Sequence, residues 1–99
     1  MLFMVLTRRH NEAFSDSDYT PERLDAEAEA VRRLYMTGVV SQIWHRGDTG
    51  GACLLMQGSS GDQIRSALHS LPLFAAGMQE AVSIVPLLPY RGFGPRGLR

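Results

Sequence analysis

The chain has 99 residues, of which 44% are hydrophobic and 20% charged, and its formal net charge is zero. This length fits a single domain, and this composition is typical of a globular protein rather than a disordered one. Because basic and acidic residues balance, the sequence gives no reason to expect broad electrostatic binding to nucleic acid or to an anionic membrane.

Three further features bear on where the protein works. Cys53 is the single cysteine, so no intrachain disulfide can form and a reducing compartment is expected. The apolar start Met1–Leu6 is too short for a signal peptide. No stretch approaches the ~18 apolar residues of a membrane span. We therefore expect a cytoplasmic protein.

The first half of the chain predicts a strand, a loop and a helix. Leu2–Thr7 is an apolar run rich in strand formers, whereas residues 8–20 are polar, lack periodicity and are predicted to form a loop. Thr20–Glu22 is typical of a helix start, with Thr as the N-cap, Pro at the first position and an acid in the first turn. Gly38 is expected to end this helix.

The second half predicts a hairpin, a second helix and a last strand. Val39–Arg46 and Ala52–Gln57 are predicted strands on either side of the glycine-rich turn Gly47–Gly51. Ser60–Gln63 has the pattern of a capping box, and Pro72 is expected to close the helix that follows. The last strand is predicted over residues 81–88.

This order of elements predicts an α+β domain over residues 1–88, followed by a Gly/Pro/Arg-rich tail over residues 89–99. Two right-handed βαβ halves give the ferredoxin-like β-α-β-β-α-β fold, a four-stranded antiparallel sheet with two helices on one face. The strands carry apolar residues on both faces, and no helix remains to cover the second face. We therefore expect sheet-on-sheet pairing into a homodimer or larger homo-oligomer, the dimeric α+β barrel arrangement.

One acid lies on the apolar side of the first helix. At about 100° per residue, Glu27 falls between Leu24 and Leu34, on the side that is expected to face the sheet. Burial there raises the pKa of a carboxyl group, as a general base needs near neutral pH. In this interpretation Glu27 lines an enclosed pocket. In the other, it lies at the edge of the apolar stripe and reaches solvent or pairs with an arginine.

Other candidate residues are less specific. His45 shares a strand face with Ile43. There it either faces the pocket or forms its hydrogen bonds within the sheet. Trp44 and Tyr35 are large apolar side chains that could also form ligand platforms. The histidines and Cys53 have no metal-ligand spacing, and no phosphate-binding glycine loop follows a strand, so no metal or cofactor is expected.

Several segments together resemble the muconolactone isomerase family. They are Met1–Phe3, the helix that ends at Gly38, the pair Ile43-Trp44 and, most specifically, Leu71–Phe74. The resemblance implies sheet-to-sheet dimers, a small-molecule pocket between sheet and helices, and cofactor-free proton transfer in a small lactone. Glu27 matches a family glutamate and is the implied base.

The chain also departs from that family. Met4 stands where the family has a histidine, and Gly50 and Ala52 stand where it has a tyrosine and an asparagine, so a roomier and more apolar pocket is expected. The residues expected to act are Glu27 as base with His45 as a possible second group, and Met4, Tyr35, Trp44, Ala52 and Phe74 around the substrate.

Three functions remain open from the sequence. The first is a cofactor-independent isomerase or lyase that acts on a small carbonyl-bearing compound, of lactone or of aromatic or polyketide origin. The second is a non-catalytic dimer that binds a small molecule or stabilises a partner. The third is a cofactor-free oxygenase of the same fold. For the tail, which carries Arg91, Arg96 and Arg99, we expect order only through a neighbouring subunit, with a nucleic-acid-binding arm as the alternative.

Overall fold

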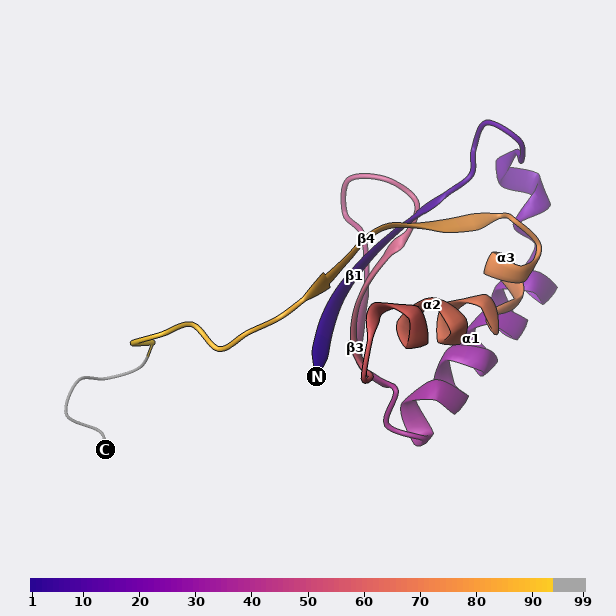
Figure 1. Ribbon diagram of the computed structural model, residues 1–99. Coiled ribbons are helices and arrows are strands. Elements are labelled where there is room, and N and C mark those ends of the chain that lie inside the picture. The colour runs from indigo at the N-terminus through magenta and orange to yellow at the C-terminus, as the bar shows by residue number, and fades with distance from the viewer. Residues whose placement is uncertain (94–99) are drawn as a thin grey trace.

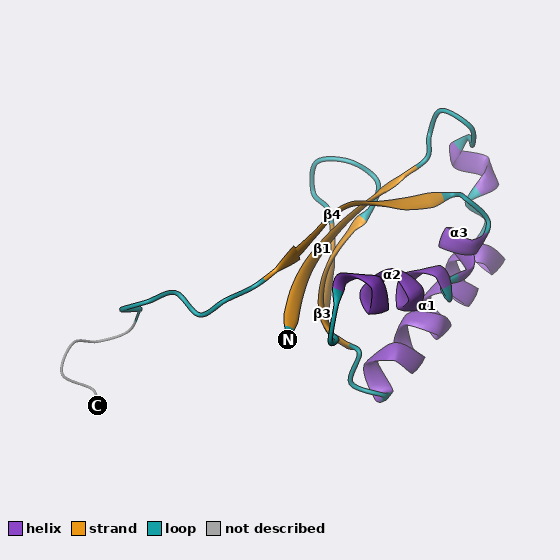
Figure 2. Ribbon diagram, viewed as in Figure 1, coloured by secondary structure: helices purple, strands orange, loops and turns teal. Residues whose placement is uncertain are grey.

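The computed structural model describes residues 1–93, which form one four-stranded sheet with its helices on one side (Figures 1 and 2). All strand pairs are antiparallel, in the order β2-β3-β1-β4. The predicted ferredoxin-like α+β fold is therefore confirmed. The elements in chain order are β1 (Leu2–Arg9), the 3-10 turn η1 (Asp16–Asp18), α1 (Pro21–Met36), β2 (Val40–His45), β3 (Ala52–Gln57), α2 (Gly61–His69), α3 (Pro72–Ala75) and β4 (Gln79–Pro86).

The long helix α1 begins and ends at the predicted signals. The Thr20 side chain accepts a hydrogen bond from the backbone N–H of Arg23 at 3.3 Å, and Pro21 occupies the first turn, where its missing N–H costs nothing. Beyond the helix, Gly38 adopts a φ of +84°, which other residues rarely adopt. Local capping chemistry therefore sets both ends of α1.

The segment after α2 differs from the prediction. Ser60 caps α2 as expected, by accepting from the backbone N–H of Gln63 at 3.1 Å, and α2 ends at His69. Pro72, which we expected only to close this helix, instead begins the short helix α3. Proline fits the first turn of a helix as well as it ends one, and burial of Leu73 and Phe74 stabilises the turn.

The first and last strands, β1 and β4, also extend further than predicted at one end. β1 continues to Arg9 and β4 begins at Gln79, because these residues pair with each other and Arg8 pairs with Glu80. The Nε atom of Arg8 donates to Glu80 at 2.6 Å. The expected loop over residues 8–20 is therefore shorter and contains η1. β4 ends at Pro86, two residues before the predicted end.

The face of the sheet toward the helices carries the main core. Phe3 and Val5 of β1 lie opposite Met56 and Leu54 of β3, and all four side chains are buried. Ile64 and Leu68 of α2, together with Leu71 and Phe74, cover this face; the set forms one cluster.

The other face of the sheet is also apolar, as predicted. Met4 lies opposite Leu55 on β3 and Val85 on β4, and Trp44 lies opposite Cys53. Trp44 is 49% exposed and Val85 is 46% exposed, because no helix among residues 1–93 covers this side (Figure 1). We call this surface the outer face.

The chain leaves the sheet after β4. Leu87 donates its backbone N–H to Leu2 at 2.9 Å, and beyond it the chain extends away from the domain (Figure 1). Leu88, Tyr90 and Phe93 are all highly exposed. Arg96 and Arg99 of the predicted tail lie outside the described residues, so the domain boundary at residue 88 stays a prediction. Over residues 1–93, no helix is long and apolar enough to cross a bilayer.

Candidate functional site

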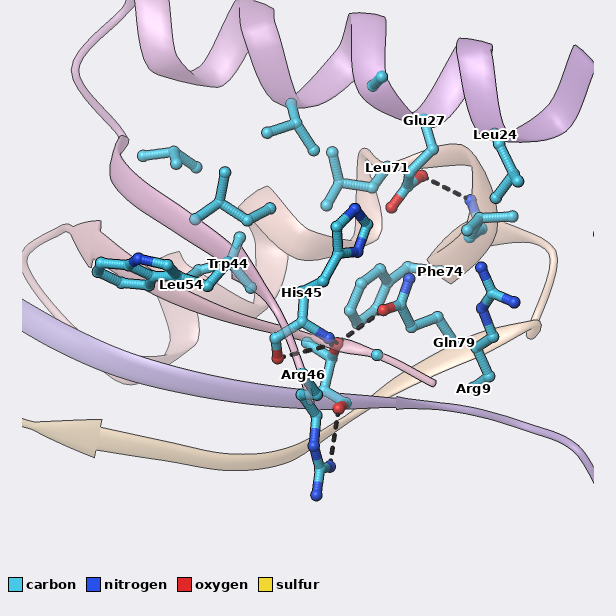
Figure 3. Close-up of a pocket in the computed structure, with 18 of the residues that line it drawn as sticks. Arg9, Leu24, Glu27, Trp44, His45, Arg46, Leu54, Leu71, Phe74 and Gln79 are labelled. Carbon is cyan, nitrogen blue, oxygen red and sulfur yellow. Dashed lines mark hydrogen bonds between the residues drawn. The ribbon is translucent and has the colours of Figure 1, made fainter. Parts of the chain in front are cut away.

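A cleft of about 910 Å³ separates α1 from the face of the sheet that is turned toward the helices, which we call the inner face. Side chains from α1, β1, β2, β3, α3 and β4 line it, as does the turn between β2 and β3 (Figure 3). Its volume lies within the range of about 300–1,000 Å³ that is typical of small-molecule sites.

The cleft exists because part of the apolar stripe of α1 has nothing packed against it. Ala30 is buried and Leu34 half-buried, but Leu24 and Tyr35 are 37% and 59% exposed. On the opposite wall, Ile43 of the edge strand β2 is also exposed. The enclosed pocket that we expected is therefore wrong: the site is a cleft, open to solvent between α1 and β2.

Glu27 reaches into this cleft from the middle of α1. One carboxylate oxygen, Oε1, accepts a hydrogen bond from the backbone N–H of Leu73 at 2.9 Å, and the other points into the cleft (Figure 3). Burial raises the pKa of Glu27 above its ordinary value, against the smaller opposing effect of the Leu73 hydrogen bond. No arginine pairs with Glu27 among residues 1–93. A half-buried carboxyl group with one free oxygen is suited to taking up a proton.

His45 enters the cleft from the opposite wall. It lies opposite Ala52 in the register of β2 and β3, on the inner face, and its ring points toward α1 (Figure 3). The next residue, Arg46, lines the cleft but is occupied: it donates to Asp48 through two nitrogens, at 2.9 and 2.8 Å, and to the carbonyl oxygen of Thr7 at 3.1 Å. The structure thus brings Glu27 and His45 to one cleft.

Four of the five residues expected around the substrate also line the cleft, namely Tyr35, Trp44, Ala52 and Phe74. Phe74 is buried at its base, whereas Trp44 alternates with His45 along β2 and lies at its edge. Met4 does not line it, so that expectation is wrong. Phe3 and Val5 point inward, and strand alternation therefore turns Met4 to the outer face, where its sulfur lies 3.1 Å from that of Cys53.

Several polar residues of the cleft were missed from the sequence, and Arg9 and Gln79 are among them. Arg9 and Gln79 face it from the paired ends of β1 and β4, and Gln79 accepts a hydrogen bond from the Thr7 hydroxyl at 2.6 Å. The missing signal was the alternation of β1: a strand extended to Arg9 places Arg9 on the same face as Val5 and Thr7. The polar neighbours of Arg9 instead predict a loop at this position.

No protein-family model and no curated protein sequence matches this chain. Among solved structures, it is similar to the 5-chloro-2-hydroxyhydroquinone dehydrochlorinase of Burkholderia phenoliruptrix AC1100 in complex with 2,5-dihydroxybenzoquinone. The TM-score is 0.56 at 19% identity, and the match covers 86% of this chain and 89% of that one. At this identity the similarity shows a shared fold alone. In the other protein, the α+β domain binds a small molecule.

Proposed function

We propose that this protein is a cofactor-independent isomerase or lyase that moves a proton in a small carbonyl-bearing compound, with Glu27 as the general base. The observation that carries the proposal is the placement of Glu27: half-buried, with a raised pKa, and fixed through one oxygen by Leu73 while the other faces a cleft of substrate size. A raised pKa makes the carboxylate a stronger base, which is the direction that removal of a proton from carbon requires.

The chemistry follows from a carboxylate beside an enolisable carbon. The free oxygen of Glu27 takes the proton from the carbon next to a carbonyl group, and the electron pair of the broken C–H bond forms an enolate. Return of the proton to a different carbon completes an isomerisation, whereas loss of a leaving group from the adjacent carbon completes a lyase reaction. His45, on the opposite wall, is the second group that we propose for handling the proton or the enolate oxygen.

Two likenesses support a small-molecule enzyme. The sequence resembles the muconolactone isomerase family, in which Glu27 matches a glutamate. The structurally similar dehydrochlorinase is named for the loss of chloride from a hydroquinone and binds a quinone. Both reactions concern small oxygenated rings, and the apolar lining supplied by Leu24, Val31 and Phe74 suits such a ring.

We also propose that the working unit is a homodimer or a larger homo-oligomer. The apolar outer face, with Trp44 and Val85 half-exposed, supports this assembly because a second copy of the same face would remove both from water. The extended segment at residues 87–93, with its exposed Leu88, Tyr90 and Phe93, is then expected to pack on a neighbouring subunit.

A non-catalytic binding protein is the second candidate. The cleft contains Gly50 and Ala52 at the positions where the resemblance places a tyrosine and an asparagine. A cleft without these two polar groups is better suited to binding an apolar ligand than to stabilising an enolate. The experiment below separates the two, because binding without proton transfer is one of its outcomes.

Proton exchange into a test substrate distinguishes the candidates. α-Angelica lactone and 5-chloro-2-hydroxyhydroquinone are incubated with the protein in D₂O, and deuterium incorporation and chloride release are followed by NMR and ion chromatography. We expect the wild type to accelerate at least one reaction and Glu27→Gln to lower that rate by at least about 10²-fold. Asp25→Asn, an exposed change on the same helix, is the control. Equal rates in wild type and Glu27→Gln contradict catalysis by Glu27, and no exchange at all with either compound favours the binding protein.

A further inference from the structure

Arg9 is held in the cleft by an aromatic ring. Its guanidinium carbon lies 4.3 Å from the centroid of Tyr19, a residue only 5% exposed. Tyr19 is itself fixed, because its hydroxyl group donates to the carbonyl oxygen of Met78 at 2.6 Å. A cation–π contact positions a guanidinium without neutralising its charge. Figure 3 shows the group beneath Leu24 and beside Gln79, on the sheet wall that faces α1 and Glu27.

Gly50 makes room for the stem of this arginine. A Cβ atom at residue 50 would lie 2.9 Å from Cδ and 3.3 Å from Cγ of Arg9, closer than ordinary packing allows. The backbone of the two residues is also joined, because the N–H of Arg9 donates to the carbonyl oxygen of Gly50 at 3.2 Å. Arg9 is therefore held in the lining of the cleft by two contacts: Tyr19 packs against its guanidinium group, and Gly50 packs against its stem.

The charge of Arg9 has no acidic partner within residues 1–93. Arg8 pairs with Glu12 and Glu80, Arg32 with Glu29, and Arg46 with Asp48, but no ion pair forms at Arg9. Glu27 is the acidic residue of the cleft lining, and no arginine contributes to its pKa shift. A guanidinium that is fixed, partly desolvated and without a carboxylate is a site for an oxyanion.

We propose that Arg9 forms an anion subsite of this cleft and that the substrate is a small organic anion, with its charge on a carboxylate or an ionised enol. This rests on the proposed function in that it takes the cleft at Glu27 as the substrate site. The fork of N–H donors on Arg9 binds the anionic oxygen atoms. The substrate is thereby oriented with an uncharged carbon toward Glu27, since its anionic end is drawn to the arginine.

Calorimetric titrations with matched pairs of compounds test the subsite. 2,5-Dihydroxybenzoquinone is an ionised enol at neutral pH, and 2,5-dimethoxybenzoquinone is its neutral counterpart. Muconolactone carries a carboxylate, and β-angelica lactone, which has the same unsaturated ring, is its neutral counterpart. We expect Arg9→Gln to weaken binding of at least one anion by about tenfold or more, the loss of one charge-assisted contact. The neutral partner of that anion should keep its affinity within about twofold. The anion that is affected identifies which source of negative charge the subsite accepts.

Two variants control for indirect effects. Arg8→Gln removes one positive charge from the adjacent residue, which forms an ion pair with Glu80 on the face of β1 opposite to that of Arg9. This variant should leave the affinities for the anion and for its neutral partner unchanged. Gly50→Ala keeps the charge but displaces the stem of Arg9, and should weaken anion binding more than binding of the neutral partner.

The outcomes separate this subsite from the proposed function. Glu27→Gln should abolish proton exchange yet retain the anion, because Glu27 does not bind it. If exchange survives Glu27→Gln while Arg9→Gln loses the anion, the proposed function fails and the subsite stands. The subsite is overturned if the wild type binds neither anion, if Arg9→Gln binds both as tightly as the wild type, or if Arg8→Gln has the same effect.

Discussion

The Glu27 carboxylate on α1 and the backbone amide of Leu73 in α3 are joined by a hydrogen bond of 2.9 Å. This one contact joins the acid that the sequence singled out to the short helix that the sequence did not predict. It fixes one oxygen of the carboxylate and leaves the other for the cleft. It also gives the buried N–H group of Leu73 a hydrogen-bond partner.

Substitution of Glu27 is expected to show this structural role separately from catalysis. Glu27→Gln retains an oxygen that can accept from Leu73, whereas Glu27→Ala leaves that amide unsatisfied. We therefore expect Glu27→Ala to be less stable than Glu27→Gln by about 1 kcal/mol or more at neutral pH. Urea unfolding of the two variants measures the difference. The matched exposed pair, Asp25→Ala and Asp25→Asn, should differ much less, and equal stabilities of the two Glu27 variants would show that the hydrogen bond contributes nothing.

The raised pKa of Glu27 gives a defined pH dependence of stability. Because burial raises the pKa above 4.5, the folded state keeps this proton at pH values where the unfolded chain has released it. The resulting stabilisation is complete below the unfolded pKa and is lost as the pH rises through the folded one. Glu27→Gln cannot ionise, so it should gain stability relative to the wild type across this window. The gain should stay below about 1 kcal/mol, since the carboxyl group is only partly buried.

Chemical denaturation of wild type and Glu27→Gln from pH 4 to pH 8 measures this gain. A difference that is constant with pH, or that changes in favour of the wild type, would contradict the burial of the charged form. Asp25→Asn, an exposed change on the same helix, is measured alongside as the control.

The parts of the fold that follow from local chemistry could be read from the sequence. Thr20 and Pro21 set the start of α1, Ser60 set the start of α2, and each signal acts within one helical turn. Pro72 was misinterpreted because proline is equally compatible with ending one helix and beginning the next. Burial of Leu73 and Phe74 against the sheet decides between the two, and no local pattern contains that information.

The site was predictable where it depends on periodicity and not where it depends on pairing between strands. Glu27 stood out because helical spacing placed it among apolar residues. Met4 was expected around the substrate, whereas the alternation of Phe3 and Val5 turns it to the outer face once the inner face is known. Arg9 reaches the cleft only because Gln79 pairs with it and extends β1, a contact between residues far apart in the chain.

Gly51 is expected to be the least replaceable glycine of the hairpin. Its φ is +142°, and a Cβ atom there would overlap the carbonyl oxygen of Thr7 and lie 3.0 Å from Cα of Arg8. Gly51→Ala should therefore cost about 2 kcal/mol or more in the free energy of unfolding. Gly47→Ala, in the same turn with nothing within 4 Å, should change it by less than about 0.5 kcal/mol. Thermal or urea unfolding compares the two, and similar costs would contradict this geometry.

The outer face is expected to hold the subunits together. Val85 is already half-exposed in the single chain, so Val85→Lys should fold, but a charge buried between two sheets is costly. Sedimentation velocity at micromolar concentration should show a dimer or larger species for the wild type and a shift toward monomer for Val85→Lys. Met36→Lys changes an exposed apolar residue at the end of α1 and should leave the assembly intact. Sedimentation of the wild type as a folded monomer would contradict the proposed interface.

Glu27 is proposed as a proton-accepting group in a ligand-binding cleft, and the NMR signal of its side-chain carboxyl carbon reports both properties. We propose a ¹³C NMR titration of the Glu27 carboxyl group, assigned by its loss in Glu27→Gln, with and without 2,5-dihydroxybenzoquinone. We expect a pKa of Glu27 above 4.5 in the free protein and a change of the Glu27 signal when the quinone is added. A carboxyl group that titrates at or below 4.5 and does not respond to the quinone would contradict this proposal.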